Sequence, residues 1–330
     1  MPDLAPSAPQ NNRPGPPLVC DLSPLSLLAI DGADATAFLQ GQLSNDVNAL
    51  APGRAHYTSY NSPKGRMLAN FVLWRDGAGY RALLPGDVAE SVRKRLAMYV
   101  LRSKVTLADV SAASSRFGVG GPGAPEALAA ALGVVPEPFV VAPAGDATVL
   151  ALPGPRFVVI VAAAAAEATR SVLLRHAALA PYDTWRWLTI RAGVPIVTAA
   201  TQDQFVAQTA NWELLGGVSF QKGCYTGQEI IARTQHLGRL KERTFAFHVD
   251  AADVVAGARL YSTVFGEQAC GTIVDAAPAP GGGTDLLAVV QTAATEAGEV
   301  RLGSPDGPLL APLPLPYALP APVAPRGRVG

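Results

Sequence analysis

The order of short strands and helices constrains this chain more than any other feature of its sequence. In the first two-thirds, two apolar runs flank a short turn rich in glycine or proline, and a helical pattern follows directly. Because strands joined by such a turn pair antiparallel, the pattern predicts an α+β fold and not a doubly wound parallel sheet. The unit occurs twice, with runs at 71–74 and 80–84 before a helix from Asp87, and runs at 148–152 and 157–161 before an alanine-rich helix through Arg175.

Capping residues and proline predict where the helices begin. Asp34 precedes an apolar helical pattern, and Asp87 with Glu90 three positions later has the spacing of a capping pair. A further helix is expected over 181–191, where a proline suits the first turn, and it carries Trp185. We therefore expect helices on either side of the first hairpin and another near the middle of the chain.

The pattern changes after residue 243 to short strands separated by glycine and proline, which is typical of a small β domain. The expected strands are 244–249, 271–274, 286–290 and 309–315. We expect an α+β body over 18–240, a β-barrel-like domain over 241–319, and flexible Pro-rich tails at 1–17 and 320–330.

The composition excludes several classes of function. The charges balance at 26 basic and 26 acidic residues, which gives no overall field for nucleic acid or an anionic membrane. Cys20, Cys224 and Cys270 lie far apart, and with only four histidines neither a disulfide framework nor a metal site is indicated. Since no apolar stretch is long enough to span a bilayer and the start lacks the pattern of a secretion signal, we expect a soluble, cytoplasmic protein.

The segment 221–233 carries the strongest indication of chemistry. Thr226 and Glu229 have capping-box spacing ahead of apolar residues, so a helix is expected to begin near Gly227. The positive end of that helix and the charge of Lys222 would favour a thiolate at Cys224 and lower its pKa. The alternative, that Cys224 is a small buried residue in a structural turn, stays open at this point.

This segment and several others resemble the YgfZ family of folate-binding proteins, which are relatives of the glycine-cleavage aminomethyltransferases. The resemblance covers most of residues 18–240, and its most specific part is Lys222-Gly223-Cys224-Tyr225-Thr226-Gly227-Gln228-Glu229. The other matching segments are 38–47, 62–66, 99–105, 188–195 and 204–220.

The resemblance implies a three-domain cloverleaf, with two intertwined subdomains in the body and tetrahydrofolate or a one-carbon-substituted form in a central channel. It also implies a role in assembling or repairing iron–sulfur proteins, including enzymes that modify tRNA, which would be the partners of this chain. Trp185 falls where the family has a folate-contacting tryptophan, whereas Leu25 stands at the place of a second one. The other expected folate contacts are Gln208, Lys222, Tyr225 and Arg233, and Cys224 is the expected reactive residue.

One departure from the aminomethyltransferases argues against their reaction. Ala69 and Asn70 occupy the positions of a pair of aspartates, and neither side chain can act as a general base. Two other functions stay open. One is a folate-dependent one-carbon transferase on an unknown acceptor. The other is tRNA binding through a local basic run at Arg233, Arg239, Lys241 and Arg243, although we expect no stable nucleic-acid complex.

Overall fold

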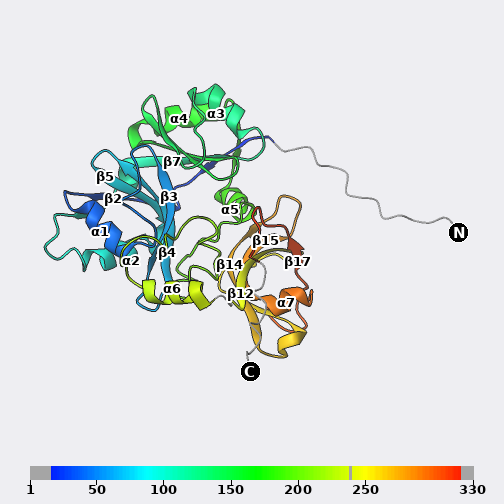
Figure 1. Cartoon of the computed structure of the whole chain (residues 1–330). Coiled ribbons are helices and arrows are strands. Elements are labelled where there is room, and N and C mark those ends of the chain that lie inside the picture. The colour runs from blue at the N-terminus through cyan, green and yellow to red at the C-terminus, as the bar shows by residue number, and fades with distance from the viewer. Residues whose placement is uncertain (1–15, 238–239, 321–330) are drawn as a thin grey trace.

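Three β-sheets form three lobes around helix α5 (Tyr182–Arg191) in the computed structural model, which describes residues 16–237 and 240–320 (Figure 1). The expectations for the extreme tails at 1–15 and 321–330, and the one for Arg239, lie outside the described residues. The mixed α+β fold with three lobes is confirmed.

The first lobe is a five-stranded sheet of order β3-β4-β5-β2-β6 with two helices on its outer face. The predicted hairpin is present, with Val72 opposite Leu83 and Trp74 opposite Arg81. Side chains of this sheet alternate between the helices and the centre of the molecule, which is why buried residues occur on both faces of its central strands. The elements are β2 (Leu25–Asp31), α1 (Ala35–Gln42), β3 (Ala55–Asn61), β4 (Met67–Asp76), β5 (Gly79–Pro85), α2 (Gly86–Ala97) and β6 (Thr106–Asp109).

The second lobe repeats this plan with a six-stranded sheet of order β11-β1-β7-β10-β9-β8. The second predicted hairpin forms β9 and β10, where Val158 lies opposite Leu150. Figure 1 shows α3 and α4 on the outer side of this sheet, away from α5. The elements are β1 (Leu18–Asp21), β7 (Ser114–Gly120), α3 (Ala124–Leu132), β8 (Val141–Ala144), β9 (Ala147–Leu152), β10 (Arg156–Ala162), α4 (Ala166–Leu173) and β11 (Ala178–Ala180).

The third lobe is a curled six-stranded sheet, a half-barrel of order β16-β13-β14-β15-β12-β17. The four strands expected after residue 243 all occur in it. Before it, α6 (Gln228–Leu237) begins at the position expected from the sequence. The elements of the lobe are β12 (Glu242–Val249), β13 (Arg259–Tyr261), β14 (Ala269–Pro278), β15 (Thr284–Gln291), α7 (Thr292–Glu296), β16 (Arg301–Leu302) and β17 (Ala311–Leu313).

The two predicted aspartate caps are wrong, although both helices form. The Asp34 carboxylate accepts a hydrogen bond from the backbone N–H of Lys104 at 2.7 Å and makes none to α1. The Asp87 carboxylate likewise accepts from the N–H of Ala199 at 2.9 Å, and α2 has no side-chain cap. Both carboxylates therefore tie distant segments to the helix starts, a use that local spacing does not reveal.

Candidate functional site

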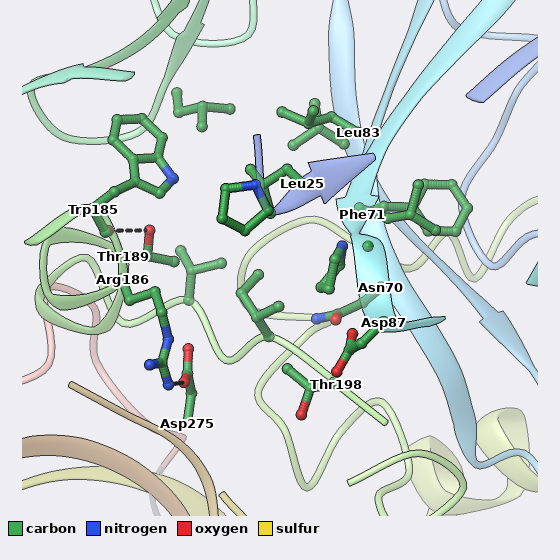
Figure 2. Close-up of a pocket in the computed structure, with 18 of the residues that line it drawn as sticks. Leu25, Asn70, Phe71, Leu83, Asp87, Trp185, Arg186, Thr189, Thr198 and Asp275 are labelled. Carbon is green, nitrogen blue, oxygen red and sulfur yellow. Dashed lines mark hydrogen bonds and ion pairs between the residues drawn. The ribbon is translucent and has the colours of Figure 1, made fainter. Parts of the chain in front are cut away.

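A cavity of about 360 Å³ lies where the three lobes meet. Its wall combines residues of β4 and β5, of β9 and β10, of α5, of the segment 194–198, and of β14. Figure 2 shows Trp185, Leu25 and Leu83 along one part of this wall, and Asn70, Asp87 and Thr198 along another. The wall is mainly apolar with a few polar groups, which is typical of a site for a small organic ligand.

The Trp185 ring lies flat against β7, at a place where this strand has glycines and so presents no side chain. A Cβ atom on Gly118 of β7 would sit 2.4 Å from the Trp185 ring, and one on Gly120 would sit 2.6 Å from the Leu188 side chain. Since such contacts are far shorter than van der Waals distance, only glycine at these positions admits α5 so close to the sheet. The glycines of β7 thus determine where Trp185 can lie.

The residues after Trp185 fix the same helix to the half-barrel. The Arg186 guanidinium donates to the Asp275 carboxylate at 2.6 Å and to the backbone oxygen of Ala276 at 2.5 Å. The Trp187 indole N–H donates to the buried carboxylate of Asp285 at 2.8 Å. Helix α5 is therefore held by two lobes at once, and this anchoring limits the movement of Trp185.

Arg156 brings a buried positive charge to the cavity wall. The residue is 2% exposed, and its guanidinium donates to Pro153 O, to Thr189 Oγ1 at 3.0 Å and to the Tyr57 hydroxyl at 3.4 Å. Its carbon Cζ lies 5.9 Å from the centre of the Trp185 ring. No carboxylate of the described residues lies within ion-pair distance of it. A buried cation with only neutral partners favours a ligand with an electron-rich or anionic edge.

The cavity wall also shows why Ala69 and Asn70 are not equivalent. Ala69 packs in the outer core between β4 and the helices, so its side chain faces away from the cavity. Asn70 lines the cavity, but its amide is already used: Nδ2 donates to Pro195 O at 2.6 Å, and Oδ1 accepts from Val197 N at 2.8 Å. Asn70 thus holds the segment that forms one side of the cavity.

Two carboxylates on the wall, Asp275 and Asp87, were not expected from the sequence to belong to the site. Asp275 is 3% exposed, and burial raises its pKa while the Arg186 guanidinium acts in the opposite direction. Asp87 is exposed and bound to Ala199 N. A signal for Asp275 existed, because a charged residue inside the apolar run of β14 requires a partner. Arg156 gave no such signal, since it stands at the edge of its strand.

Of the seven site residues expected from the sequence, only Trp185 and Leu25 are among the residues that line this cavity. Lys222 is buried elsewhere, and its ammonium donates to the carbonyl oxygens of Gln40, Leu43 and Asn45 at 2.7, 2.6 and 2.9 Å. These carbonyls lie at or just beyond the end of α1, where free carbonyl groups and the negative end of the helix dipole favour a cation. Lys222 therefore attaches the loop at 222–229, which we call the cysteine loop, to the first lobe.

The side chains of Tyr225 and Gln208 also make contacts within the protein and do not line the cavity. Tyr225 is buried in the central core, 5.0 Å below the Lys222 ammonium, and burial raises its pKa to about 12. The Gln208 side-chain amide donates to the carbonyl oxygen of Ile231 in α6 at 2.7 Å. Arg233, on α6, is exposed. Gly227 has φ of +81° and packs against the turn at Gly65, so its missing side chain serves a backbone contact within the chain.

The three cysteines differ in exposure. Cys224 is exposed, whereas Cys20 and Cys270 are buried. Burial raises the pKa of Cys20 to about 11 and raises that of Cys270 as well. The expectation that Cys224 reacts faster than the other two stays a prediction, which its exposure supports. Within residues 16–237 and 240–320, no cluster of histidine, cysteine or carboxylate side chains has the arrangement of a metal site.

Comparison with known proteins places the chain in a family. A tRNA-modifying protein YgfZ of Serratia proteamaculans is 32% identical over 309 residues, which cover 92% of this chain and 93% of the relative. The chain belongs to the YgfZ family. A YgfZ protein of Escherichia coli is 32% identical over 89% of this chain and 91% of its own length, and one of Shigella sonnei is 36% identical over 66% and 67%.

Two further comparisons agree with this assignment to the YgfZ family. The GCVT N-terminal domain matches residues 18–137. A solved structure of the glycine cleavage system aminomethyltransferase T from Bartonella henselae superposes with a TM-score of 0.71, covering 90% of this chain and 85% of that one at 16% identity. At that identity the likeness shows the shared fold alone, which confirms the aminomethyltransferase-like arrangement expected from the sequence.

Among the described residues, no helix combines the length and apolar character needed to cross a membrane.

Proposed function

We propose that this chain binds tetrahydrofolate, or a one-carbon-substituted form of it, in the central cavity and serves the assembly or repair of iron–sulfur proteins, including enzymes that modify tRNA. The observation that carries the proposal is the cavity itself, where Trp185 lies on a wall built from all three lobes. The relatives are named as tRNA-modifying proteins, and membership in their family supports the same process.

The residues on the wall fit a folate ring. A pterin needs an apolar or aromatic surface and a few polar groups at its amide-like edge. Trp185 and Leu25 supply the surface, and Arg156 supplies buried donors. When bound, tetrahydrofolate would supply a carrier for a one-carbon group. The chain's own residues bind and orient the ring, and the three lobes keep water from much of it.

Trp185→Ala is expected to weaken tetrahydrofolate binding about tenfold, because the ring loses its stacking surface and the cavity widens. Isothermal titration under anaerobic, reducing conditions measures this. Trp187→Phe is the matched control, since Trp187 lies on the same helix but bonds Asp285 in the half-barrel. Leu25→Trp should tighten binding by adding a second aromatic surface. Equal affinity in wild type and Trp185→Ala would show that the folate ring does not lie against Trp185.

The role in iron–sulfur proteins is tested in a strain that lacks the gene. Wild type should restore iron–sulfur enzyme activities and thiolated tRNA, and we expect Cys224→Ser to fold normally and to restore neither. The exposed position of Cys224 allows contact with a partner protein. Full restoration by the serine variant would show that the thiol is not needed. The task would then rest on the cavity and on the fold of the loop.

A one-carbon transferase is the second candidate, and the carboxylates of Asp87 and Asp275 on the cavity wall favour it. Asp275 is paired with Arg186, whereas Asp87 is exposed and only one of its two oxygens accepts a hydrogen bond, from Ala199 N. Single-turnover incubation with methylene-tetrahydrofolate separates the two functions. Loss of the carbon to an acceptor would establish a transferase, whereas retention is expected of an accessory protein.

The basic run has fewer positive side chains available to bind nucleic acid than its sequence indicates. Arg243 points into the protein, where it donates to Gln208 O at 2.8 Å and pairs with the buried carboxylate of Glu213. It is therefore not available for a phosphate, which supports the expectation of no stable complex with tRNA.

A further inference from the structure

A second hollow, of about 890 Å³, adjoins the central cavity. Pro24 and Tyr182 line both, so the two hollows share a wall at the start of α5. The second hollow runs between the turn after β1, the start of β7 and helix α4, and we refer to it as the serine groove. Its hydroxyl-bearing wall residues besides Tyr182 are Ser23, Ser111, Ser114 and Ser115.

Arg116 is the buried cation of the serine groove. It is 5% exposed, and its Nη1 donates to Ser111 O, Ser114 O and Ser114 Oγ at 3.0 to 3.1 Å. Its Nε is buried and has no hydrogen-bond partner among the described residues. No carboxylate of that part of the chain lies within 4.0 Å of the guanidinium, and burial lowers its pKa. A buried donor without an acceptor is costly, so this geometry favours a ligand that supplies one.

Asp109 and Asp21 raise the pKa of Arg116 against the effect of burial, but neither carboxylate pairs with its guanidinium within 4.0 Å. Asp21 lies at the exposed rim, where its carboxylate accepts from Ser23 N at 2.8 Å. The Glu167 side chain is 80% exposed and pairs with Arg170 at 3.7 Å. Both carboxylates are therefore solvated or already bonded at the rim, whereas the buried part of the groove carries hydroxyl groups and one arginine.

The register of the second sheet relates the serine groove to Trp185. Arg116, Gly118 and Gly120 alternate along β7, so they share the face that Trp185 covers. A ligand whose ring lies against Trp185 could therefore extend along this face of β7 towards Arg116. The shared wall at Pro24 and Tyr182 lies on that path.

We propose that the serine groove binds the carboxylate tail of a polyglutamylated folate whose ring occupies the central cavity, with Arg116 as the buried anchor and Arg170 at the rim. This inference rests on the proposed folate binding and names the form of folate that the protein prefers. Each added γ-linked glutamate carries a further carboxylate, which arginine and serine donors bind as charge-assisted hydrogen bonds.

The test compares tetrahydrofolate carrying one glutamate with tetrahydrofolate carrying three, by isothermal titration of the full chain. Wild type should bind the triglutamate about tenfold more tightly. Arg116→Gln should reduce that ratio to about one and leave the affinity for the monoglutamate within about twofold. Because Arg116 also bonds backbone groups, Arg170→Glu is the second variant, a change at a partly exposed side chain that should lower the ratio without preventing folding.

Arg175→Glu is the control, since Arg175 is exposed and does not line the groove. Equal affinities for the two folates in wild type would overturn the inference and leave folate binding intact. An equal loss for both folates in Arg170→Glu would overturn it as well. If neither folate bound to wild type, both the inference and the proposed function would be rejected.

Discussion

Lys222→Met is expected to lower the free energy of unfolding by about 3 kcal/mol at pH 7, because a buried charge-assisted network is removed. The ammonium is the donor shared by three backbone carbonyls at the end of α1, and it also lies over the Tyr225 ring. Methionine keeps the apolar stem but donates nothing. Chemical denaturation followed by circular dichroism measures the change.

The effect of Lys222 should also depend on pH. Burial lowers the pKa of Lys222 to about 8, with Asp46 acting in the opposite direction, from 10.5 for an ordinary lysine. Between these values the unfolded chain binds more protons than the folded one, so the stability due to Lys222 rises with pH across this window. The difference between wild type and Lys222→Met should therefore grow from pH 8 to 10.

Lys64→Met is the matched control, since Lys64 is exposed and its replacement should change stability by less than about 0.5 kcal/mol. If Lys222→Met were as stable as this control, the ammonium would not fasten the cysteine loop. Its part in the motif would then concern a ligand or partner.

Asn70→Asp is expected to cost about 3 kcal/mol at pH 7, although it introduces a carboxylate of the kind found in the aminomethyltransferases. The side chain is fully buried between Pro195 O and Val197 N. An ionised carboxylate would still accept from Val197 N, but it would face the Pro195 carbonyl without a proton to donate. The segment that forms one side of the cavity would then lose its attachment.

The Asn70→Asp variant should recover stability in acid. Burial raises the pKa of the introduced carboxyl above the ~3.9 of an aspartate in an unfolded chain. The folded variant then holds its proton to higher pH, so stability falls as pH rises above about 4. Asn70→Ala, which removes both hydrogen bonds without adding charge, should lose stability equally at pH 5 and pH 7. An Asn70→Asp protein as stable as wild type at pH 7 would contradict this account.

Local pattern was sufficient to predict most helices and strands, because the two hairpins and the apolar face of α2 depend on neighbours in sequence. The capping roles of Asp34 and Asp87 were wrong, since each carboxylate bonds a backbone N–H far along the chain. Short-range spacing cannot distinguish a cap from such a long-range tie. The same residue types satisfy both.

The candidate site was harder to predict, because its wall is assembled from three lobes. Trp185 and Leu25 came from resemblance to a family, and the structure brings both to the cavity. Arg156 stands at the edge of its strand and gave no signal, and the charge of Asp275 inside an apolar run indicated a partner but not the cavity. The conspicuous motif around Cys224 misses the cavity because Lys222 turns inward to α1 and holds that loop in another part of the molecule.

Hydrogen–deuterium exchange with and without tetrahydrofolate tests the central claim most directly, because it needs no substitution. The central cavity and the loop at 222–229 are separate, so each would give its own pattern of protection. We expect slower exchange in α5 and in the segment 194–198 when folate is bound, with little change at 222–229. Protection confined to 222–229, or no protection in α5, would contradict the assignment of the cavity as the folate site.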